Sequence, residues 1–419
     1  MTKVNPRPRS WARLAISAVV AVIASLGIMV FSGAAPLTPP AETIPASFFG
    51  LHVHHLATTT PWPDVPFGEW RLWDAYVAWP NLEPQKGQWH FENLDSYVAL
   101  AKSHHVDLLL PLGLSPHWAS SRPDEKSTYQ PGNAAPPVNM EDWRNYVKTV
   151  ASRYNGQIHS YEIWNEPNLK GEFWSGNVEQ MVALTREASQ IIHGIDPAAI
   201  VVSPSATGVY GVSWLSEFLS KGGGQYVDVI GYHLYVNPQP PEAMVPLVQQ
   251  IQQILASNNL ASKPIWNTES NWFSPKPFPS EDVAAGYLAR AYILNWAAGI
   301  QRFYWFAWDN RAVLVKTTED DNRTSTPAGN AYGVVYQWLV GAQMEACNQD
   351  ANHTYVCQLT RAGSSAWIVW NPDGARTFDV PKSWHAGFVT PLLGQTQALT
   401  GSTTNIGPVP VLLKQSAQP

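Results

Sequence analysis

The chain has 419 residues, of which 45% are hydrophobic, 12% aromatic and only 14% charged. This composition can fill a large core, so it excludes a disordered chain, and the length exceeds that of one small module. The 32 acidic residues outnumber the 26 Lys and Arg, giving a net charge of −6. Because no basic stripe accompanies this acidic body, the sequence argues against nucleic acid as a partner.

An uninterrupted apolar run at residues 14–31 follows a basic start and precedes small residues at positions 32–35. The run is longer than the apolar part of a secretory signal, about 7–15 residues, and shorter than the roughly 20 residues of a membrane-spanning helix. We therefore expect residues 1–35 to be a cleaved signal peptide or an N-terminal membrane anchor. Both predict an exported protein, either secreted or periplasmic or attached to the membrane. Residues 36–46 would then form a stiff Pro-rich spacer.

Short apolar strands alternate with amphipathic helices over residues 47–344. The predicted strands are residues 48–54, 69–74, 106–113, 158–165, 200–205, 227–235, 264–269 and 302–309. Apolar spacing and capping residues predict helices at 91–101, 143–150, from Asn177 to Gly194, around 247–254, from Ser280 to about Gly299, and at 327–344. Eight strands in βα order fit a closed (β/α)8 TIM barrel better than an open sheet.

The sequence pattern changes after Glu345. Short β-rich runs follow at 354–360, 366–370, 388–393 and 408–413, separated by turn residues. This pattern predicts a small C-terminal β-sandwich over residues 345–419. Cys347 and Cys357 lie ten apart in a hairpin-like segment, which suits a disulfide in an oxidising compartment or, alternatively, two unpaired thiols. Trp367 and Trp370 could bind sugar at an edge of this domain or form a structural sheet face.

Two predicted strands deliver a carboxylate to the same rim of the barrel. The fourth strand ends at Asn165-Glu166-Pro167 and the seventh ends at Glu269. Active sites of such barrels lie at the C-terminal ends of the strands, and strands four and seven lie nearly across the barrel from each other. Two facing carboxylates, one protonated and one ionised, are what glycoside hydrolysis needs.

These segments resemble retaining glycoside hydrolases on (β/α)8 barrels, and most fully glycoside hydrolase family 39. The resemblance covers about residues 48–344 and rests on Arg71-Leu72-Trp73-Asp74, Trp79, residues 113–120 (GLSPHWAS), residues 161–168 (YEIWNEPN) and His233-Leu234-Tyr235. The surroundings of Glu269 match more loosely than those of Glu166. The resemblance implies a TIM barrel with a trailing β-sandwich, acting on a poly- or oligosaccharide without a cofactor or metal.

The resemblance also implies a role for each matching residue. Glu166 would be the general acid/base and Glu269 the nucleophile, with their carboxyl groups about 5–5.5 Å apart. Asn165 would bind the sugar hydroxyl next to the anomeric carbon, and His233 and Tyr235 would orient the nucleophile. Further candidate substrate-binding residues are Trp118, Trp305 and Trp308 as stacking platforms, and His117 and His54. Arg71 would keep Glu269 ionised or, alternatively, form a structural ion pair with Glu162 inside the barrel.

Two other readings stay open from the residues. A metal-dependent hydrolase could use His52 and His54 with His233 and Asp309, but the fifth strand offers no His. A non-catalytic saccharide-binding or scaffolding protein of an envelope assembly could keep the same barrel without turnover. The acidic stretch at residues 320–322 is expected to be a solvated loop rather than a Ca²⁺ site. Among relatives that cleave xylosides, iduronides or exopolysaccharide, the N-terminal segment favours a bacterial exopolysaccharide as substrate.

Overall fold

A computed structural model describes residues 37–56, 58–273 and 277–416. The expected signal peptide or membrane anchor at residues 1–35 lies outside the described residues. Within the part of the chain that the structure describes, no helix is both long and apolar enough to span a membrane.

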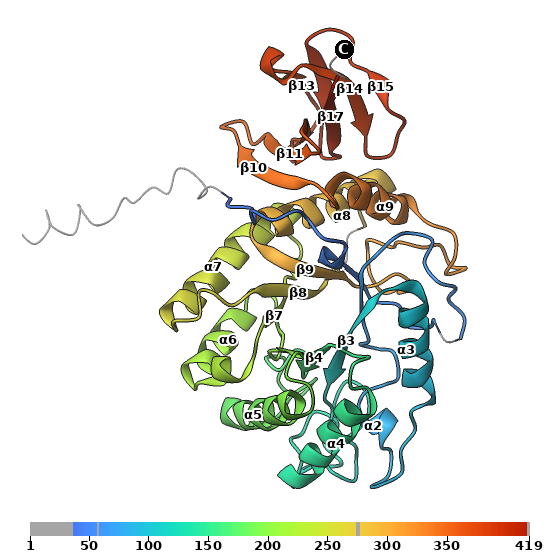
Figure 1. The fold of residues 1–419 in the computed structure, drawn as a ribbon, viewed down its shortest axis with the longest axis vertical. Helices are drawn as coiled ribbons and strands as arrows, with labels where there is room; N and C mark the ends of the chain where they lie inside the picture. Colours follow the sequence, from blue (N-terminus) through green and yellow to red (C-terminus); the bar gives the residue numbers. More distant parts are fainter. Residues whose placement is uncertain (1–36, 57, 274–276, 417–419) are drawn as a thin grey trace, which may run out of the picture. The chain divides into compact units, whose positions relative to one another are not determined.

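Nine parallel strands form the sheet at the centre of the molecule (Figure 1). In chain order they are β1 (Phe49–Leu51), β2 (Glu69–Arg71), β3 (Asp107–Leu112), β4 (Ser160–Ile163), β5 (Ile200–Val202), β6 (Ala206–Thr207), β7 (Ile230–His233), β8 (Ile265–Ser270) and β9 (Ile300–Trp305). Their order in the sheet is β5-β4-β3-β2-β1-β9-β8-β7-β6. Backbone hydrogen bonds between β5 and the residues before β7, such as Ser203 N–H to Val229 O, join the two ends. The predicted TIM barrel is confirmed.

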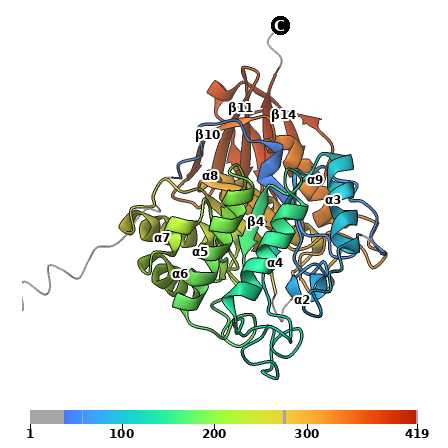
Figure 2. The ribbon, with the colours of Figure 1, turned by 60° about the horizontal axis from the view of Figure 1, so that its bottom comes forward.

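Helices surround this sheet (Figure 2). They are α2 (Trp79–Leu82), α3 (Glu92–His104), α4 (Met140–Arg153), α5 (Val178–Ile195), α6 (Gly211–Ser220), α7 (Met244–Ser257), α8 (Glu281–Ala297) and α9 (Pro327–Leu339). Asn177 and Ser280 cap α5 and α8, and Asn177 forms a full capping box with Gln180. Gly194 lies inside α5 rather than beyond its end. The last helix stops at Leu339, five residues before its predicted end, because Gly341 turns the chain with φ +82° into the next strand.

The barrel strands are buried almost throughout, since the helices cover their outer face and side chains fill the interior. Leu109, Val202, Val229, Trp266 and Tyr304 form one interior apolar cluster. Gly50 on β1 leaves room for this filling, because a Cβ at that position would come within 2.5 Å of the Tyr304 ring.

The C-terminal residues form two antiparallel sheets, as the predicted β-sandwich requires. One has the order β10-β11-β12-β17-β14-β15 and the other pairs β13 with β16. The strands are β10 (Gln343–Gln349), β11 (Tyr355–Arg361), β12 (Ser364–Trp370), β13 (Arg376–Asp379), β14 (Ala386–Pro391), β15 (Gln397–Ala398), β16 (Thr403–Ile406) and β17 (Val411–Gln415). Cys347 and Cys357 are directly opposed on β10 and β11 and joined by a disulfide.

The two tryptophans considered for sugar binding in this domain are structural. Trp367 is buried and stacks on Trp384, with ring centroids 4.5 Å apart. Trp370 is fully buried, stacks on Tyr355 and donates its indole N–H to Glu242, which lies ahead of α7. Both side chains are therefore buried within the protein.

Candidate active site

Glu166 and Glu269 reach the same end of the barrel by different backbone routes. Glu269 belongs to β8 itself, whereas Glu166 follows β4 in a turn where Trp164 and Glu166 both have positive φ (67° and 43°). Such left-handed conformations are uncommon outside glycine and persist where surrounding contacts hold them. Here Trp164 is buried and donates its indole N–H to Phe173 O, and Glu166 N–H bonds to Ser205 O.

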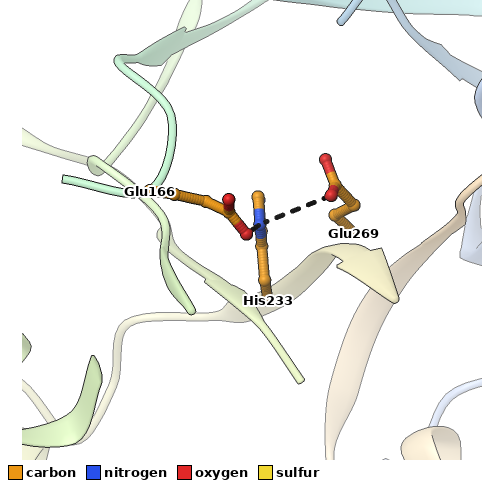
Figure 3. A group of neighbouring side chains, drawn as sticks. All are labelled: Glu166, His233 and Glu269. Carbon is orange, nitrogen blue, oxygen red and sulfur yellow. Dashed lines mark hydrogen bonds and ion pairs between the residues drawn. The ribbon is translucent and has the colours of Figure 1, made fainter. Parts of the chain in front are cut away.

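The two carboxyl groups lie close together with His233 between them (Figure 3). One oxygen of Glu166, one of Glu269 and a ring nitrogen of His233 lie within 4.8 Å of one another. The His233 Nδ1 atom is 2.9 Å from Glu166 Oε1 and 3.9 Å from Glu269 Oε1. The side chains come from the ends of β4, β7 and β8, where the sequence predicted them.

Arg71, at the end of β2, forms hydrogen bonds with three other residues of the site. Its Nε donates to Glu162 at 2.6 Å, its Nη1 to Glu269 at 2.8 Å and its Nη2 to Asn165 at 2.7 Å. The two alternatives considered for this residue, contact with Glu269 and an ion pair with Glu162, are thus both present. All three nitrogens of the guanidinium group are engaged, and the side chain is fully buried. Arg71 therefore ties the candidate nucleophile and Asn165 to the interior of the barrel.

Glu162, which accepts from Arg71, is itself held by two hydroxyl groups that the sequence analysis did not identify. Its Oε1 accepts hydrogen bonds from Thr268 at 3.0 Å and from Ser205. Thr268 also donates to Ser205 at 2.8 Å, so the three side chains form one network. Thr268 lies on β8 and Ser205 directly precedes β6, and only the fold brings them to Glu162.

Burial is the largest influence on the pKa values of Glu166 and Glu269. It raises the pKa of Glu166 to about 7 and that of Glu269 to about 7. For Glu269, the nearby Glu166 raises the pKa further, while His233, Arg71 and the hydrogen bond from Tyr235 lower it. Arg71 thus acts in the expected direction on Glu269, but the loss of hydration is the larger effect.

His233 and Tyr235 contact the glutamates in their neutral forms. Burial lowers the pKa of His233 to about 4, so the ring is neutral near pH 7. Burial, together with the charge of Glu269, holds the pKa of Tyr235 well above its usual value. The Tyr235 hydroxyl donates to Glu269 Oε1 at 2.8 Å. These two side chains can orient the carboxylates without adding charge.

Four candidate substrate-binding residues lie away from the carboxylate pair or are covered. Trp305 and Trp308 belong to the main apolar core with 0% and 1% exposure, so they cannot serve as stacking platforms. Trp118 donates to Glu83 O, packs edge-on against Trp79 and carries the Lys86 ammonium over its ring. His117 is exposed and faces Asp124. The predictions of Trp305 and Trp308 as stacking platforms are therefore wrong, because alternation and motif position alone do not tell which face of a strand end a ring occupies. Those for Trp118 and His117 stay predictions.

A cavity of about 470 Å³ opens beside the pair and brings in residues that the sequence analysis did not assign. His54, which was assigned, lines it together with Trp73, Asp74 and Tyr129. Tyr129 comes from the long segment between β3 and α4 and donates to Asp74. The sequence could have pointed to Asp74, because it is the last residue of the Arg71-Leu72-Trp73-Asp74 motif. No local sequence pattern points to Tyr129.

The four residues of the metal-site alternative do not come together. Asp309 accepts the backbone N–H groups of His54 and His55 and the Thr60 hydroxyl, and His52 Nε2 faces Thr268 O. In the described ranges, the one group of three His, Cys, Asp or Glu side chains close enough to share an ion is Glu166, His233 and Glu269. The Arg71 guanidinium already contacts Glu269, and a second cation there would be repelled.

Comparisons with known proteins show which family this chain resembles. The family model described as "Glycosyl hydrolases family 39" matches residues 70–303. The chain is 30% identical over 152 residues to a β-xylosidase of Caldicellulosiruptor saccharolyticus, covering 35% of this chain and 31% of that protein. It is 24% identical over 224 residues to a β-xylosidase of Geobacillus stearothermophilus, covering 47% and 43%. The matches thus span less than half the length of these relatives.

Solved structures show the same fold at low identity. A family 39 β-xylosidase from Caulobacter crescentus has a TM-score of 0.63 at 17% identity, covering 91% of this chain and 98% of that one. A glucosidase from Croceicoccus marinus has a TM-score of 0.64 at 15% identity, covering 90% and 97%. Because the family model spans more than half of the sequence, this chain belongs to glycosyl hydrolase family 39.

Proposed function

We propose that the protein is a retaining glycoside hydrolase that cleaves a poly- or oligosaccharide by double displacement. The observation that carries this proposal is the approach of Glu166 and Glu269, with oxygens within 4.8 Å. Retaining enzymes hold their two carboxyl groups about 5–5.5 Å apart, whereas inverting enzymes need about 6.5–9.5 Å to admit a water molecule. The short separation supports direct attack by one of the carboxylates.

Glu269 is the nucleophile and Glu166 the acid/base. The protonated Glu166 gives its proton to the leaving oxygen while the Glu269 carboxylate attacks the anomeric carbon and forms an ester. A water molecule, deprotonated by Glu166, then releases the sugar and restores both groups. A pKa of Glu166 raised to about 7 suits this double role near neutral pH. Hydrogen bonds from Arg71 and Tyr235 hold both oxygens of Glu269.

Asn165 is placed to bind the sugar hydroxyl next to the anomeric carbon. Its Oδ1 accepts from Arg71, which leaves the amide Nδ2 as the free donor. In the described part of the chain, Nδ2 is buried and has no hydrogen-bond partner. A buried amide without a partner costs free energy, and a substrate hydroxyl would relieve that cost. A bond that strengthens as charge develops at the sugar ring would stabilise the transition state.

The relatives guide the choice of substrate. Two curated relatives are β-xylosidases, so β-xylosides are the first candidates. A bacterial exopolysaccharide is the other candidate. The basic residues up to position 13 and the apolar run at residues 14–31 support export of the protein. Export would place the protein where bacterial exopolysaccharides occur.

The test is the release of reducing ends by residues 36–419 from β-xylosides and from plant and bacterial polysaccharides, beside the Glu269→Ala variant. The proposal expects release by the unmodified protein and a loss of at least about 10³-fold in the variant, as for removal of a nucleophile. Saccharide binding without release would contradict it and would support the non-catalytic alternative instead.

A further inference from the structure

The cavity beside the catalytic pair is formed by residues that follow the first three barrel strands. His54 follows β1, Trp73 and Asp74 follow β2, and Leu114 follows β3. Trp73 lies against Arg71, whose guanidinium carbon is 5.8 Å from the ring centroid. Burial raises the pKa of the Tyr129 phenol, and the charges of Asp74, Glu269 and Glu166 raise it further. Tyr129 and Trp73 both line the cavity, and the contact of Trp73 with Arg71, which donates to Glu269, places the cavity next to the site of bond cleavage.

The charge around this cavity is negative. Asp74 is its one acidic lining residue, and the described residues that line it include neither Lys nor Arg. Arg71, the nearest cation, is fully engaged by Glu162, Glu269 and Asn165. Burial lowers the pKa of His54, which favours the neutral ring, and His55 faces Asp309 at 3.3 Å. No cation in the described lining is thus free to pair with an anionic ligand.

Asp74 is held in an unusual conformation that presents its carboxylate at the cavity. Its φ of 56° lies in the left-handed region, which Asp and Asn tolerate better than most residues. The Tyr129 hydroxyl donates to Oδ1, and Oδ2 receives no hydrogen bond from the described residues. His54 also lines the cavity, and its buried Nε2 has no hydrogen-bond partner in the described chain. The cavity thus offers a carboxylate oxygen of Asp74 as a free acceptor, as a polyhydroxylated ligand requires.

We propose that Asp74 is a specificity-determining residue that accepts hydrogen bonds from the hydroxyls of an uncharged sugar in this cavity and, with Glu269, repels sugars bearing a carboxylate or sulfate group. This inference rests on the proposed glycosidase function and narrows its substrate class. At an effective dielectric constant of about 20, two like charges roughly 6 Å apart reduce affinity by well over tenfold. Uronic acids are therefore poor substrates even where their ring hydroxyls match.

Three 4-nitrophenyl glycosides test the inference, because the β-D-xylopyranoside, β-D-glucopyranoside and β-D-glucuronide differ only in the group at C5. For the unmodified protein, kcat/KM is expected to be at least about tenfold higher on the better neutral glycoside than on the glucuronide. Asp74→Asn keeps the shape and the left-handed tolerance but removes the charge. This variant is expected to lower kcat/KM on the neutral glycoside about tenfold. It is also expected to reduce the ratio of kcat/KM on the neutral glycoside to kcat/KM on the glucuronide.

Asp379→Asn is the matched control, since it removes the same charge from an exposed position on β13. The ratio of kcat/KM on the neutral glycoside to kcat/KM on the glucuronide is expected to be the same in this variant as in the unmodified protein. A glucuronide that is cleaved as well as the neutral glycosides would overturn the inference. So would an Asp74→Asn variant whose ratio does not change.

Binding to Glu269→Gln separates this inference from the proposed function. If the unmodified protein cleaves none of the three glycosides, calorimetry with Glu269→Gln still compares their affinities. Tighter binding of a neutral glycoside, weakened by adding Asp74→Asn, supports the recognition role while the glycosidase proposal fails. Equal or tighter binding of the glucuronide, or no binding of any of the three, overturns the recognition role itself.

Discussion

At the scale of single residues, Arg71 holds the charged groups of the candidate site in place. It is fully buried and forms ion pairs with two buried glutamates, Glu162 at 2.6 Å and Glu269 at 2.8 Å. Buried ion pairs gain little over an apolar replacement of the whole group, but loss of one member leaves charges without a partner. The arrangement therefore makes Arg71 essential for folding as well as for placing Glu269 and Asn165.

Replacing Arg71 with Met is expected to lower the free energy of unfolding by about 3–5 kcal/mol at pH 7, because two carboxylates would be left buried and unpaired. Urea denaturation measures this change. The deficit should shrink at pH 5, because burial raises the pKa of Glu269 to about 7 and this carboxyl group is then protonated. The double variant Arg71→Met/Glu162→Gln should recover part of the loss. A deficit below about 1 kcal/mol at pH 7 would show that Arg71 does not hold this network together.

The raised pKa of Glu166 predicts how stability depends on pH. The unfolded carboxyl group has a pKa of about 4.3, and the folded one of about 7. Between these values the folded protein retains a proton that the unfolded chain releases, so the contribution of Glu166 is largest below about pH 4 and is lost as the pH rises to about 7. Glu166→Gln cannot titrate. Its stability relative to the unmodified protein should therefore increase from pH 4 to pH 7 in urea denaturation, and a constant difference would contradict the raised pKa.

Sequence reasoning reached the residues that stand at strand ends and missed those placed by loops. Glu166 and Glu269 were predictable, because parallel strands of a barrel deliver their C-terminal residues to one rim, and the role of Arg71 followed from the family resemblance. Tyr129 was not, since it lies in the long segment between β3 and α4, where no periodicity relates position to direction. Trp305 was misassigned because the strand pattern does not distinguish the inner face from the outer one when both are apolar.

For secondary-structure elements, the capping residues were the most reliable local signals. Asn177 accepts from the Gln180 backbone N–H while the Gln180 side chain accepts from the Asn177 N–H. Short elements without such signals, among them β6, α2 and α6, were not predicted. Two-residue strands are formed by neighbours in the sheet, here the pairing of β6 with β7, rather than by local sequence.

The capping box of α5 provides a test at this scale. Asn177→Ala removes the side-chain acceptor at the helix N-terminus and is expected to lower the free energy of unfolding by about 1 kcal/mol, without changing KM. Asn177→Ser is the control, because serine caps almost as well. Thermal and urea denaturation of the three proteins measure the effect. Equal losses in both variants would show that the residue acts through something other than its cap.

In the molecule as a whole, residues 37–416 form one compact unit in which barrel and sandwich are bonded to each other. Trp370 on β12 donates to Glu242, which pairs with the buried Arg290 of α8 at 2.8 Å. Arg361 on β11 donates to three carbonyl groups at the end of α9, those of Gln337, Trp338 and Val340. These contacts predict that the two parts unfold in one transition.

Replacing Trp370 with Phe keeps an aromatic ring against Tyr355 and removes the N–H donor to Glu242. The free energy of unfolding is expected to fall by about 1–3 kcal/mol, since the partly buried Glu242 carboxylate loses a hydrogen-bond donor and the smaller ring leaves space. Trp384→Phe, which alters only the interior of the sandwich, is the comparison. Urea unfolding followed by far-ultraviolet circular dichroism and by tryptophan fluorescence should give coincident curves in all three proteins. Two separate transitions in the unmodified protein would contradict the single unit.

The anomeric configuration of the first sugar released is the most direct test of the central claim. With a 4-nitrophenyl β-D-xyloside as substrate, proton nuclear magnetic resonance can follow the product before it mutarotates. Glu166 and Glu269 at their observed separation predict that the β-anomer appears first and then equilibrates. Initial release of the α-anomer would contradict direct attack by Glu269 and the retaining mechanism with it.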